Sequence, residues 1–367
     1  MTRDEIQENA LKAVEGKSYA GLGLATGVGK TLVGLMYLEK NVTPLKNVLI
    51  VTPKVSIMTE WRLQAQKFKK TKVLDNTTFT TYLSLNKKDP YEYDILILDE
   101  CHTLLESHKK FLDDYHGIIL GLTGTPPKIA NSEKGRMVSE FCPIVYEYLT
   151  DDAVDAKILN DYKIIVHKVK LNNTHKNVKV DTKTGGFFTT ESANYSYWSN
   201  RVDRASPGKS IQIARIMRMK ALMAFPSKER YAKLLAESIK SKCIIFANTQ
   251  EQADRICSYS YHSGNSESSA NLSKFKKGEI DKLSCVLQLS EGVNIPDLKQ
   301  GIIMHAYGNE RKSSQRIGRM LRLNPDETAT IHILCYVGTI DEKWVEDSLE
   351  GYDQKKVLWK DYNIKLY

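Results

Sequence analysis

The stretch that decides the fold is Ala25-Thr26-Gly27-Val28-Gly29-Lys30-Thr31. Its glycines allow the backbone to curl, so that successive N–H groups point inward at phosphate oxygens. The amphipathic stretch 31–39 follows and predicts a helix, whose N-terminus adds positive potential behind the loop. We therefore expect a nucleotide-phosphate loop in which Lys30 reaches the β- and γ-phosphates and the Thr31 hydroxyl binds Mg²⁺. Leu24 stands where the strict form of this pattern has a glycine.

A second pattern follows further along the chain, at Asp94-Ile-Leu-Ile-Leu-Asp99-Glu100-Cys101-His102. An apolar strand here ends in two carboxylates, which places both at the carboxyl edge of a sheet, where α/β proteins bind ligands. Asp99 suits Mg²⁺ coordination, and Glu100 suits polarisation of an attacking water. Cys101 is assigned no chemistry.

Short apolar runs alternate with amphipathic stretches over most of the chain. The expected strands are 48–51, 95–98, 118–122, 164–169, 243–246, 285–289, 301–305 and 330–336. The expected helices are 31–39, 55–68, 229–239, 250–259 and 313–323. Continuous apolar runs are typical of parallel strands covered on both faces, and their alternation with helices indicates a doubly wound α/β architecture.

The alternation breaks once, at 172–209, which is polar, basic and carries Gly185-Gly186 as a turn signal. The 367 residues are enough for two domains. We predict the following division: domain 1 at 1–150, an interdomain crossing with the first strand of domain 2 at 151–171, an insertion at 172–209, the rest of domain 2 at 210–340, and a C-terminal tail packed on the domains at 341–367.

Composition excludes several classes of protein. With 41% hydrophobic and 26% charged residues, the chain is expected to be globular rather than disordered or fibrous. No apolar run approaches the ~20 residues that span a bilayer, and the six cysteines are scattered, so we expect no membrane segment, no metal cluster and a reducing, cytoplasmic location. Residues 168–230 hold 13 Lys/Arg against 4 Asp/Glu. This excess indicates either a polyanionic partner or a solvated lysine-rich surface.

The Asp-Glu-Cys-His sequence at 99–102 resembles motif II of the superfamily 2 helicases (DExH type), and the other motifs of that superfamily follow in the expected order. They are 25–31 (motif I), Thr52-Pro53-Lys54 (Ia), Thr80-Thr81-Tyr82 (Ib), 122–127 (III), 246–249 (IV), 290–296 (V) and 315–322 (VI). The resemblance covers nearly the whole chain except 172–209. It implies two RecA-like parallel-sheet domains in tandem with an ATP cleft between them, and an ATP-hydrolysing enzyme.

The resemblance also implies residues that bind the nucleotide outside the phosphate loop. Gln7 resembles the glutamine that reads adenine, although Ile6 stands where an aromatic residue is usual; a solvated helix residue is the alternative. Gly292 and Asn294 of motif V are implied in the ATP site, and Asn294 replaces the usual aspartate.

Motif VI concentrates arginine in a chain that uses lysine about three times as often. Gln315, Arg319 and Arg322 are spaced i, i+4, i+7 and share one face of a predicted helix. Guanidinium groups suit bidentate phosphate contacts. The resemblance assigns Arg319 and Arg322 as arginine fingers for the γ-phosphate, and such fingers contribute about 10³–10⁵ in rate.

Two further groups are implied by the resemblance. The first lies along the nucleic-acid phosphate backbone and consists of Thr52, Pro53, Lys54, Thr81, Asn248 and Thr249. The second couples the ATP site to the nucleic-acid face and consists of His102, Thr123, Thr125 and Arg316. Backbone contacts carry no sequence information, so binding is expected to be sequence-independent and salt-sensitive.

The insertion has its own candidates. Trp198, Arg201 and Arg204 are expected to bind nucleic acid, because aromatic side chains beside arginines can stack on exposed bases. The alternative is that Tyr195 and Trp198 form the apolar face of a helix packed on domain 2.

The motif set looks closest to DNA translocases, including UvsW-like phage recombination helicases, RecG-like and XPB-like proteins and the motor subunits of restriction enzymes. It implies a monomeric ATP- and Mg²⁺-dependent motor on DNA, duplex or branched, with a role in recombination or repair in a bacterial or phage-infected cell. An RNA helicase or ribonucleoprotein remodeller, a restriction motor subunit, and a nucleic-acid-binding scaffold with a degenerate ATP site are the alternatives.

Overall fold

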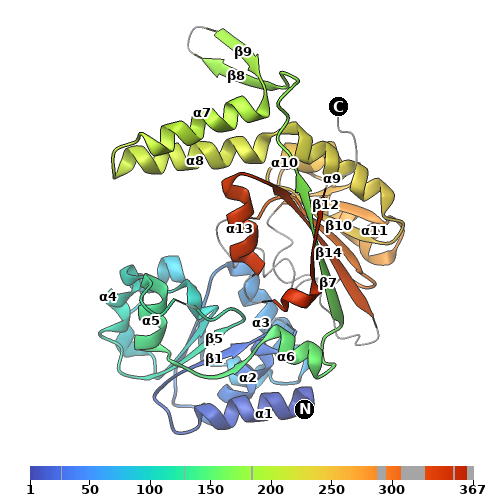
Figure 1. Cartoon of the computed structure of the whole chain (residues 1–367). Coiled ribbons are helices and arrows are strands. Elements are labelled where there is room, and N and C mark those ends of the chain that lie inside the picture. Colours follow the sequence, from blue (N-terminus) through green and yellow to red (C-terminus); the bar gives the residue numbers. More distant parts are fainter. Residues whose placement is uncertain are drawn as a thin grey trace. The chain divides into compact units, whose positions relative to one another are not determined.

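The structure is a computed structural model of the 367-residue chain, and it describes residues 1–25, 27–127, 129–182, 185–286, 295–306, 327–349 and 352–361. These residues form two compact units, one from Met1 to Asp161 and the other from Tyr162 onward. Figure 1 shows both units coloured along the sequence.

Unit 1 alternates strands and helices throughout. Its strands are β1 (Tyr19–Leu24), β2 (Val48–Thr52), β3 (Thr77–Thr81), β4 (Ile95–Asp99), β5 (Ile118–Thr123) and β6 (Ile144–Tyr148). Its α-helices are α1 (Arg3–Val14), α2 (Lys30–Asn41), α3 (Val55–Lys67), α4 (Lys109–Leu112), α5 (Glu133–Phe141) and α6 (Thr150–Asp155). Short 3-10 segments, η1 (Thr71–Leu74), η2 (Tyr82–Lys87), η3 (Pro90–Glu92), η4 (Cys101–Thr103) and η5 (Glu106–His108), occupy several connections.

The strands of unit 1 form one parallel sheet in the order β3-β2-β4-β5-β1-β6. The sequence interpretation missed β1, whose alternate glycines dilute the apolar signal. A Cβ at Gly21 would stand 2.4 Å from the Cys142 carbonyl oxygen, and one at Gly23 would stand 2.7 Å from Pro126 Cγ. The glycines are therefore required by close neighbours of the strand that leads into the phosphate loop.

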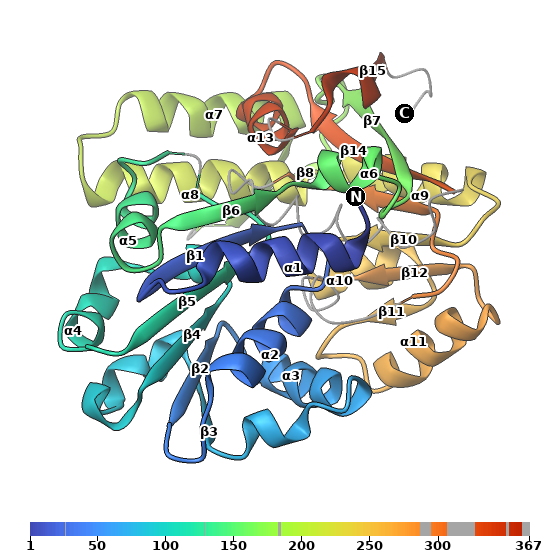
Figure 2. The same cartoon turned by 90° about the horizontal axis from the view of Figure 1, so that it is seen from below.

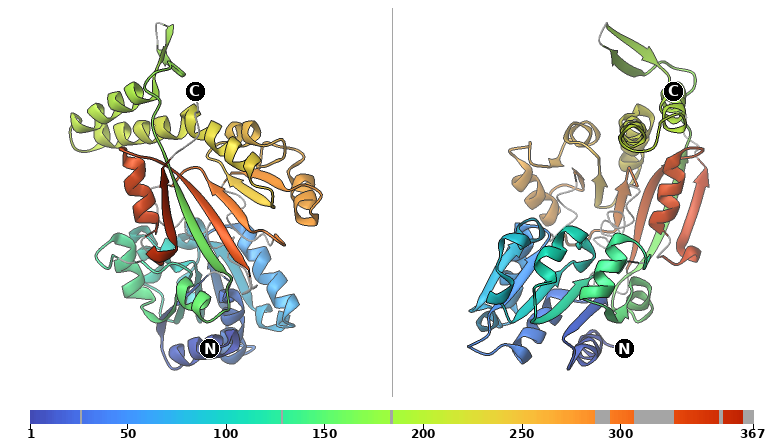
Figure 3. Two further views of the ribbon diagram at one scale, coloured as in Figure 1. Left: turned by 45° about the vertical axis from the view of Figure 1, so that its right-hand side comes forward. Right: turned by 90° about the vertical axis from the view of Figure 1, so that its left-hand side faces the viewer.

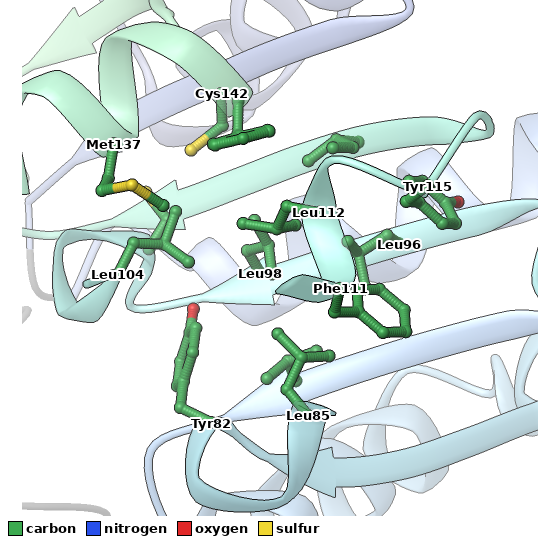
Figure 4. Close-up of a cluster of buried hydrophobic side chains, with 14 of the residues drawn as sticks. Tyr82, Leu85, Leu96, Leu98, Leu104, Phe111, Leu112, Tyr115, Met137 and Cys142 are labelled. Atoms are coloured by element: carbon green, nitrogen blue, oxygen red, sulfur yellow. The ribbon is translucent and has the colours of Figure 1, made fainter. Parts of the chain in front are cut away.

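Both faces of this sheet are covered. Helix α1 contacts α2, and α2 contacts α3, so the three helices form one layer (Figure 2). Gly34 on α2 lets the Trp61 ring of α3 approach, because a Cβ at position 34 would lie 2.4 Å from that ring. The other face carries a buried cluster that joins β2 and β4 to η2, α4 and α5, drawn in Figure 4. This cluster fixes the end of β4, where the two predicted carboxylates stand.

Unit 2 also alternates strands and helices, apart from one excursion. Its strands are β7 (Asp161–Val169), β8 (Val178–Thr182), β9 (Gly185–Thr189), β10 (Cys243–Phe246), β11 (Ser260–Tyr261), β12 (Lys282–Cys285), β13 (Gln300–Ile303), β14 (Thr328–Tyr336) and β15 (Val357–Asp361). Its helices are α7 (Glu191–Asp203), α8 (Lys209–Ala224), α9 (Pro226–Ser238), α10 (Gln250–Ile256), α11 (Ser268–Lys277), α13 (Ile340–Leu349) and the 3-10 segment η7 (Gln354–Lys356).

Seven strands of unit 2 form a sheet in the order β11-β12-β10-β13-β14-β7-β15. The predicted strand 285–289 was placed too late: β12 starts at Lys282, opposite Cys243 of β10. The sequence pattern hid this because β12 contains a buried serine, Ser284, whose hydroxyl donates to the Ala253 carbonyl at 2.7 Å. The predicted helix 313–323 lies outside the described residues.

The predicted C-terminal tail, 341–367, contributes a helix and a strand to unit 2. Within it, β15 adds an edge strand to the sheet and pairs in parallel with β7, with Val357 opposite Ile164. Helix α13 contacts β14. Within the described ranges, none of the helices has both the length and the hydrophobicity needed to cross a lipid bilayer.

The excursion overlaps the predicted insertion at 172–209 and runs beyond it to Ala224. Strands β8 and β9 pair antiparallel as a two-stranded hairpin, with Val178 opposite Thr189 and Thr182 opposite Gly185, and α7 and α8 pack on each other as a helical pair. Figures 1 and 3 show the strand hairpin projecting beyond this pair. The helical pair extends to Ala224, so α8 belongs with the insertion rather than with the region predicted from 210 onward. On α8, Ile216 is 47% exposed.

Candidate nucleotide site

The phosphate loop connects β1 to α2 and depends on two left-handed glycines. Gly27 has φ 101°, and Gly29, the N-cap of α2, has φ 105°. A side chain at either position is strained and also crowded, since a Cβ on Gly29 would lie 2.8 Å from both Arg3 and Gln7. The loop is therefore a glycine-dependent cradle at the start of a 12-residue helix, as the sequence predicted.

Two side chains of α1 brace this cradle from the outside. The Gln7 amide donates to the Val28 carbonyl at 2.8 Å, and the Arg3 guanidinium donates to the same oxygen at 2.9 Å. Gln7 is 3% exposed, so the alternative of a solvated helix residue is wrong. Its adenine-reading role stays a prediction. Arg3 was missed from the sequence, because nothing local to residue 3 indicates a contact 25 residues away.

The two predicted motifs meet through an ion pair. Lys30 Nζ lies 2.5 Å from Glu100 Oε1, and both side chains are largely buried. The strand order places β5 between β1 and β4, and Leu22, Leu122 and Asp99 stand in one row across the three strands. The loop after β1 and the acidic turn after β4 therefore open at the same edge of the sheet. Glu100 itself adopts a left-handed conformation, with φ 54°.

Asp99 is held in a buried polar setting. Its Oδ2 accepts a hydrogen bond of 2.8 Å from the Trp61 indole, and its carbonyl oxygen accepts one of 2.9 Å from the Tyr82 hydroxyl. Burial, then the Glu100 carboxylate, raise the pKa of Asp99 to about 6, while Lys30 and the Trp61 hydrogen bond oppose that rise. The position favours a nearby cation, which would replace the missing solvation of the carboxylate.

Cys101, beside these acids, shows no sign of reactivity. A hydrogen bond with the Cys142 thiol and then burial raise the pKa of the Cys101 thiol well above its usual range. A buried, protonated thiol is a poor nucleophile.

A short polar chain leaves the acidic turn toward the neighbouring strand. His102 Nδ1 hydrogen-bonds to the Thr123 hydroxyl and lies 3.3 Å from Glu100 Oε2. The Thr123 hydroxyl also accepts the Thr125 backbone N–H at 3.1 Å. The three residues predicted to couple the ATP site in unit 1 therefore form a chain of contacts that runs from Glu100 through His102 and Thr123 to Thr125.

The predicted nucleic-acid residues of unit 1 gather on adjacent strands. Thr52 and Thr81 are register partners at the ends of β2 and β3. Thr52 is fully buried and its hydroxyl donates to the Lys54 carbonyl at 3.0 Å, so it shapes the turn and does not present its hydroxyl to a ligand here. Pro53 is half-buried and Lys54 exposed at the N-terminus of α3.

In unit 2, Asn248 and Thr249 follow β10 at the carboxyl edge of its sheet. Thr249 is the N-cap of α10, and its hydroxyl accepts from the Gln252 backbone N–H at 3.2 Å. The Asn248 backbone N–H donates to the Gln252 side chain at 2.9 Å. In the insertion, Arg201 and Arg204 are exposed, and Trp198 is half-buried against Tyr197. Tyr195 accepts a hydrogen bond of 2.9 Å from the Ile340 N–H, as the packing alternative expected.

Seven predicted site residues lie outside the described residues: Thr26, Gly292, Asn294, Gln315, Arg316, Arg319 and Arg322.

Comparisons with known proteins agree with this arrangement. Residues 1–128 match the family model described as the type III restriction enzyme, res subunit, and residues 227–324 match the helicase conserved C-terminal domain. The chain is 28% identical over 376 residues to the DNA 3'-5' translocase XPB2 of Sulfurisphaera tokodaii, covering 92% of this chain and 82% of that protein.

Two solved structures have the same fold. The Hef helicase domain of Pyrococcus furiosus is similar with a TM-score of 0.56 and 14% identity, covering 94% of this chain and 97% of that one. The type ISP restriction-modification enzyme LlaBIII has a TM-score of 0.62 and 15% identity, covering 99% of this chain and 31% of that one. The two family models and the translocase relative, together with the ordered motifs, support a helicase or translocase of superfamily 2.

Proposed function

We propose that the protein is an ATP-dependent DNA helicase or translocase, which uses ATP hydrolysis to move on or remodel duplex or branched DNA. The observation that carries the proposal is the contact of Lys30, on the phosphate loop, with Glu100, beside Asp99, at one edge of a RecA-like sheet. The similarity to a DNA translocase over 92% of the chain supports DNA as the polymer.

The residues of unit 1 fit a magnesium nucleotide. The left-handed glycines shape the loop into a cradle at the start of α2. Thr31 in the first turn of α2 and the buried Asp99 would supply oxygen ligands to Mg²⁺, which typically takes one or two protein oxygens beside phosphate and water. Bound Mg²⁺ would neutralise charge that develops on the phosphates.

When nucleotide binds, the ion pair between Lys30 and Glu100 opens: Lys30 turns to the phosphate and Glu100 to the attacking water. A phosphate in the cradle competes with Glu100 for the Lys30 ammonium, because both are anions within its reach. Once released, Glu100 orients the attacking water and accepts its proton. His102 contacts the other carboxylate oxygen of Glu100, Oε2, and links the position of Glu100 to Thr123 and Thr125. Arg319 and Arg322 of motif VI are assigned to the γ-phosphate.

The proposed DNA path uses the phosphate backbone. Pro53, Lys54 and Thr81 contribute from unit 1, Asn248 and Thr249 from unit 2, and Arg201 and Arg204 from the insertion. Recognition through phosphates predicts binding that is independent of sequence and weakens steeply with salt. We further propose that the protein works as a monomer and requires Mg²⁺.

The test is ATP hydrolysis by the full chain with no polymer, single-stranded DNA, duplex DNA, a four-way DNA junction and RNA. Lys30→Ala removes the phosphate-loop ammonium, and Lys40→Ala, at an exposed position of the same helix, is the matched control. Stimulation by DNA that is lost in Lys30→Ala and kept in Lys40→Ala supports the proposal. Stimulation by RNA alone overturns the choice of polymer, and hydrolysis that survives Lys30→Ala overturns the site.

A further inference from the structure

The strand hairpin β8–β9 exposes two adjacent phenylalanines. Phe187 is 55% exposed and Phe188 is 58% exposed, opposite Val180 and Lys179 respectively in the hairpin register. Neighbouring residues of a strand point to opposite faces, so the two rings stand on both sides of the hairpin. An aromatic pair left in water on a projecting element forgoes burial and indicates a ligand.

The stem of this hairpin is anchored although its strands are exposed. The fully buried Glu191 carboxylate accepts hydrogen bonds from the Asn172 backbone N–H at 2.9 Å, and from the Ser227 N–H and hydroxyl at 2.9 and 2.7 Å. Asn172, 1% exposed, also binds the turn that leads into β8, through Thr174 and His175. These bonds tie both ends of the hairpin to α7 and α9, so the exposed rings have a fixed base.

The segment that contains the hairpin is strongly basic. Residues 168–230 hold 13 Lys/Arg and 4 Asp/Glu, a formal charge of +9, which equals the charge of the whole chain, so the remaining residues sum to zero. Lys170 and Lys176 are exposed beside the stem, and Lys179 pairs with Asp181 at 3.0 Å. Exposed rings within the segment that holds all of the net positive charge suit nucleic acid, whose phosphates meet the lysines while its bases stack on the rings.

We propose that Phe187 and Phe188 form a stacking site for bases at the point where a DNA duplex opens, so that the β8–β9 hairpin acts as a strand-separating wedge. This inference rests on the proposed function. Arg201 and Arg204 lie near the far end of α7, about 15–20 Å along its axis from the hairpin. They are therefore placed to meet phosphates of the same DNA away from the bases that stack on the rings.

The experiment uses a forked DNA duplex with 5-iodouracil at the first unpaired position. Irradiation without nucleotide cross-links a stacked aromatic side chain, and the modified peptide is identified by mass spectrometry. Three variants of the full chain are compared: Phe187→Leu/Phe188→Leu keeps the apolar character and removes the rings, Phe187→Trp/Phe188→Trp keeps them, and Tyr91→Leu removes a 73% exposed ring in unit 1 as the matched control.

We expect the wild type to cross-link at Phe187 or Phe188 and the double leucine variant to lose the cross-link. Its affinity for the fork falls at least about fivefold, the lower limit for one stacked base. Fork unwinding falls with it, while ATP hydrolysis stimulated by single-stranded DNA is unchanged. The tryptophan and Tyr91→Leu variants behave as wild type.

Several results overturn the wedge. These are a wild-type cross-link only outside the hairpin, unwinding by the leucine variant at the wild-type rate, or a loss of single-strand-stimulated hydrolysis in that variant. A dimer seen by light scattering that the leucine variant abolishes assigns the rings to a second copy of the chain instead. Because cross-linking needs no hydrolysis, a wild type without DNA-stimulated ATPase activity refutes the proposed function and still leaves the stacking site tested.

Discussion

Gln7 has two candidate roles: it braces the phosphate loop through the Val28 carbonyl, or it reads adenine. Substitution of Gln7 distinguishes them. Gln7→Ala removes a hydrogen bond between neutral partners to the Val28 carbonyl. Such a bond contributes about 0.5–1.5 kcal/mol, which corresponds to a rise of roughly 2- to 12-fold in the KM for ATP if its full value goes into ordering the loop. Because Val28 belongs to the loop and not to a base pocket, the KM for GTP rises by the same factor, and kcat changes less than twofold.

Arg3→Ala is the matched variant, because the Arg3 guanidinium donates to the same oxygen. Hydrogen bonds from charged donors contribute more, about 1.5–3 kcal/mol, so its KM effect is expected to equal or exceed that of Gln7→Ala. The assay is steady-state hydrolysis of ATP and of GTP with saturating DNA, together with the Kd of a fluorescent nucleotide. If Gln7→Ala weakens ATP alone, and Arg3→Ala weakens neither nucleotide, the brace is refuted and Gln7 reads adenine.

Three further predictions concern the acidic turn and unit 2. Glu100→Gln keeps the shape of the turn but cannot accept a proton, so DNA-stimulated kcat is expected to fall at least about 100-fold while the Kd for a fluorescent nucleotide changes little; hydrolysis at the wild-type rate would contradict its role. Lys228 and Asp341 form an ion pair of 2.5 Å, 1% and 3% exposed, so Lys228→Met is expected to lower the free energy of unfolding by about 3–5 kcal/mol in urea titrations. Adding Asp341→Asn is expected to restore most of the lost stability, because the amide oxygen can still accept the hydrogen bond of 2.8 Å that the Tyr336 backbone N–H donates to the Asp341 carboxylate. A double variant as unstable as the single one would contradict this. His167 and His332 are hydrogen-bonded at 2.9 Å, and burial lowers their pKa values to about 4 and about 3. The unfolded chain therefore binds protons first, so stability is expected to be full above about pH 6.5 and to fall by up to about 1.4 kcal/mol per pH unit per histidine toward pH 4, a slope that His332→Gln should reduce in urea titrations at pH 5 and 7.

The site in unit 1 could be predicted because its signals are local. The phosphate loop and the acidic turn are each continuous in sequence, and the carboxyl-edge rule brings them together without knowledge of the pairing. What the sequence does not reveal is long-range support. Trp61, which donates to Asp99, and Arg3 look like ordinary helix residues, and only the packing of α3 and α1 gives them their partners.

The fold shows the same division. Apolar strands such as β2 and β10 were predicted almost residue for residue. Strand β1 was missed because close neighbours require its glycines, and the polar β8 because it pairs only with β9. Strand β15 was missed because its side chains are mostly exposed and give no apolar pattern. It is a strand because it pairs at the sheet edge with β7, which is far away in sequence.

The late arrival of β15 has a consequence for synthesis of the chain. Strand β7 lies between β14 and β15, and both partners are translated long after it. At about 5–20 residues per second, β7 waits on the order of ten seconds or more with its hydrogen-bonding groups unpaired on both sides. A bare apolar strand is a template for pairing with other chains. Nascent polypeptides on neighbouring ribosomes are therefore at risk of joining through β7, and a chaperone that shields this strand should raise the yield of correctly folded protein.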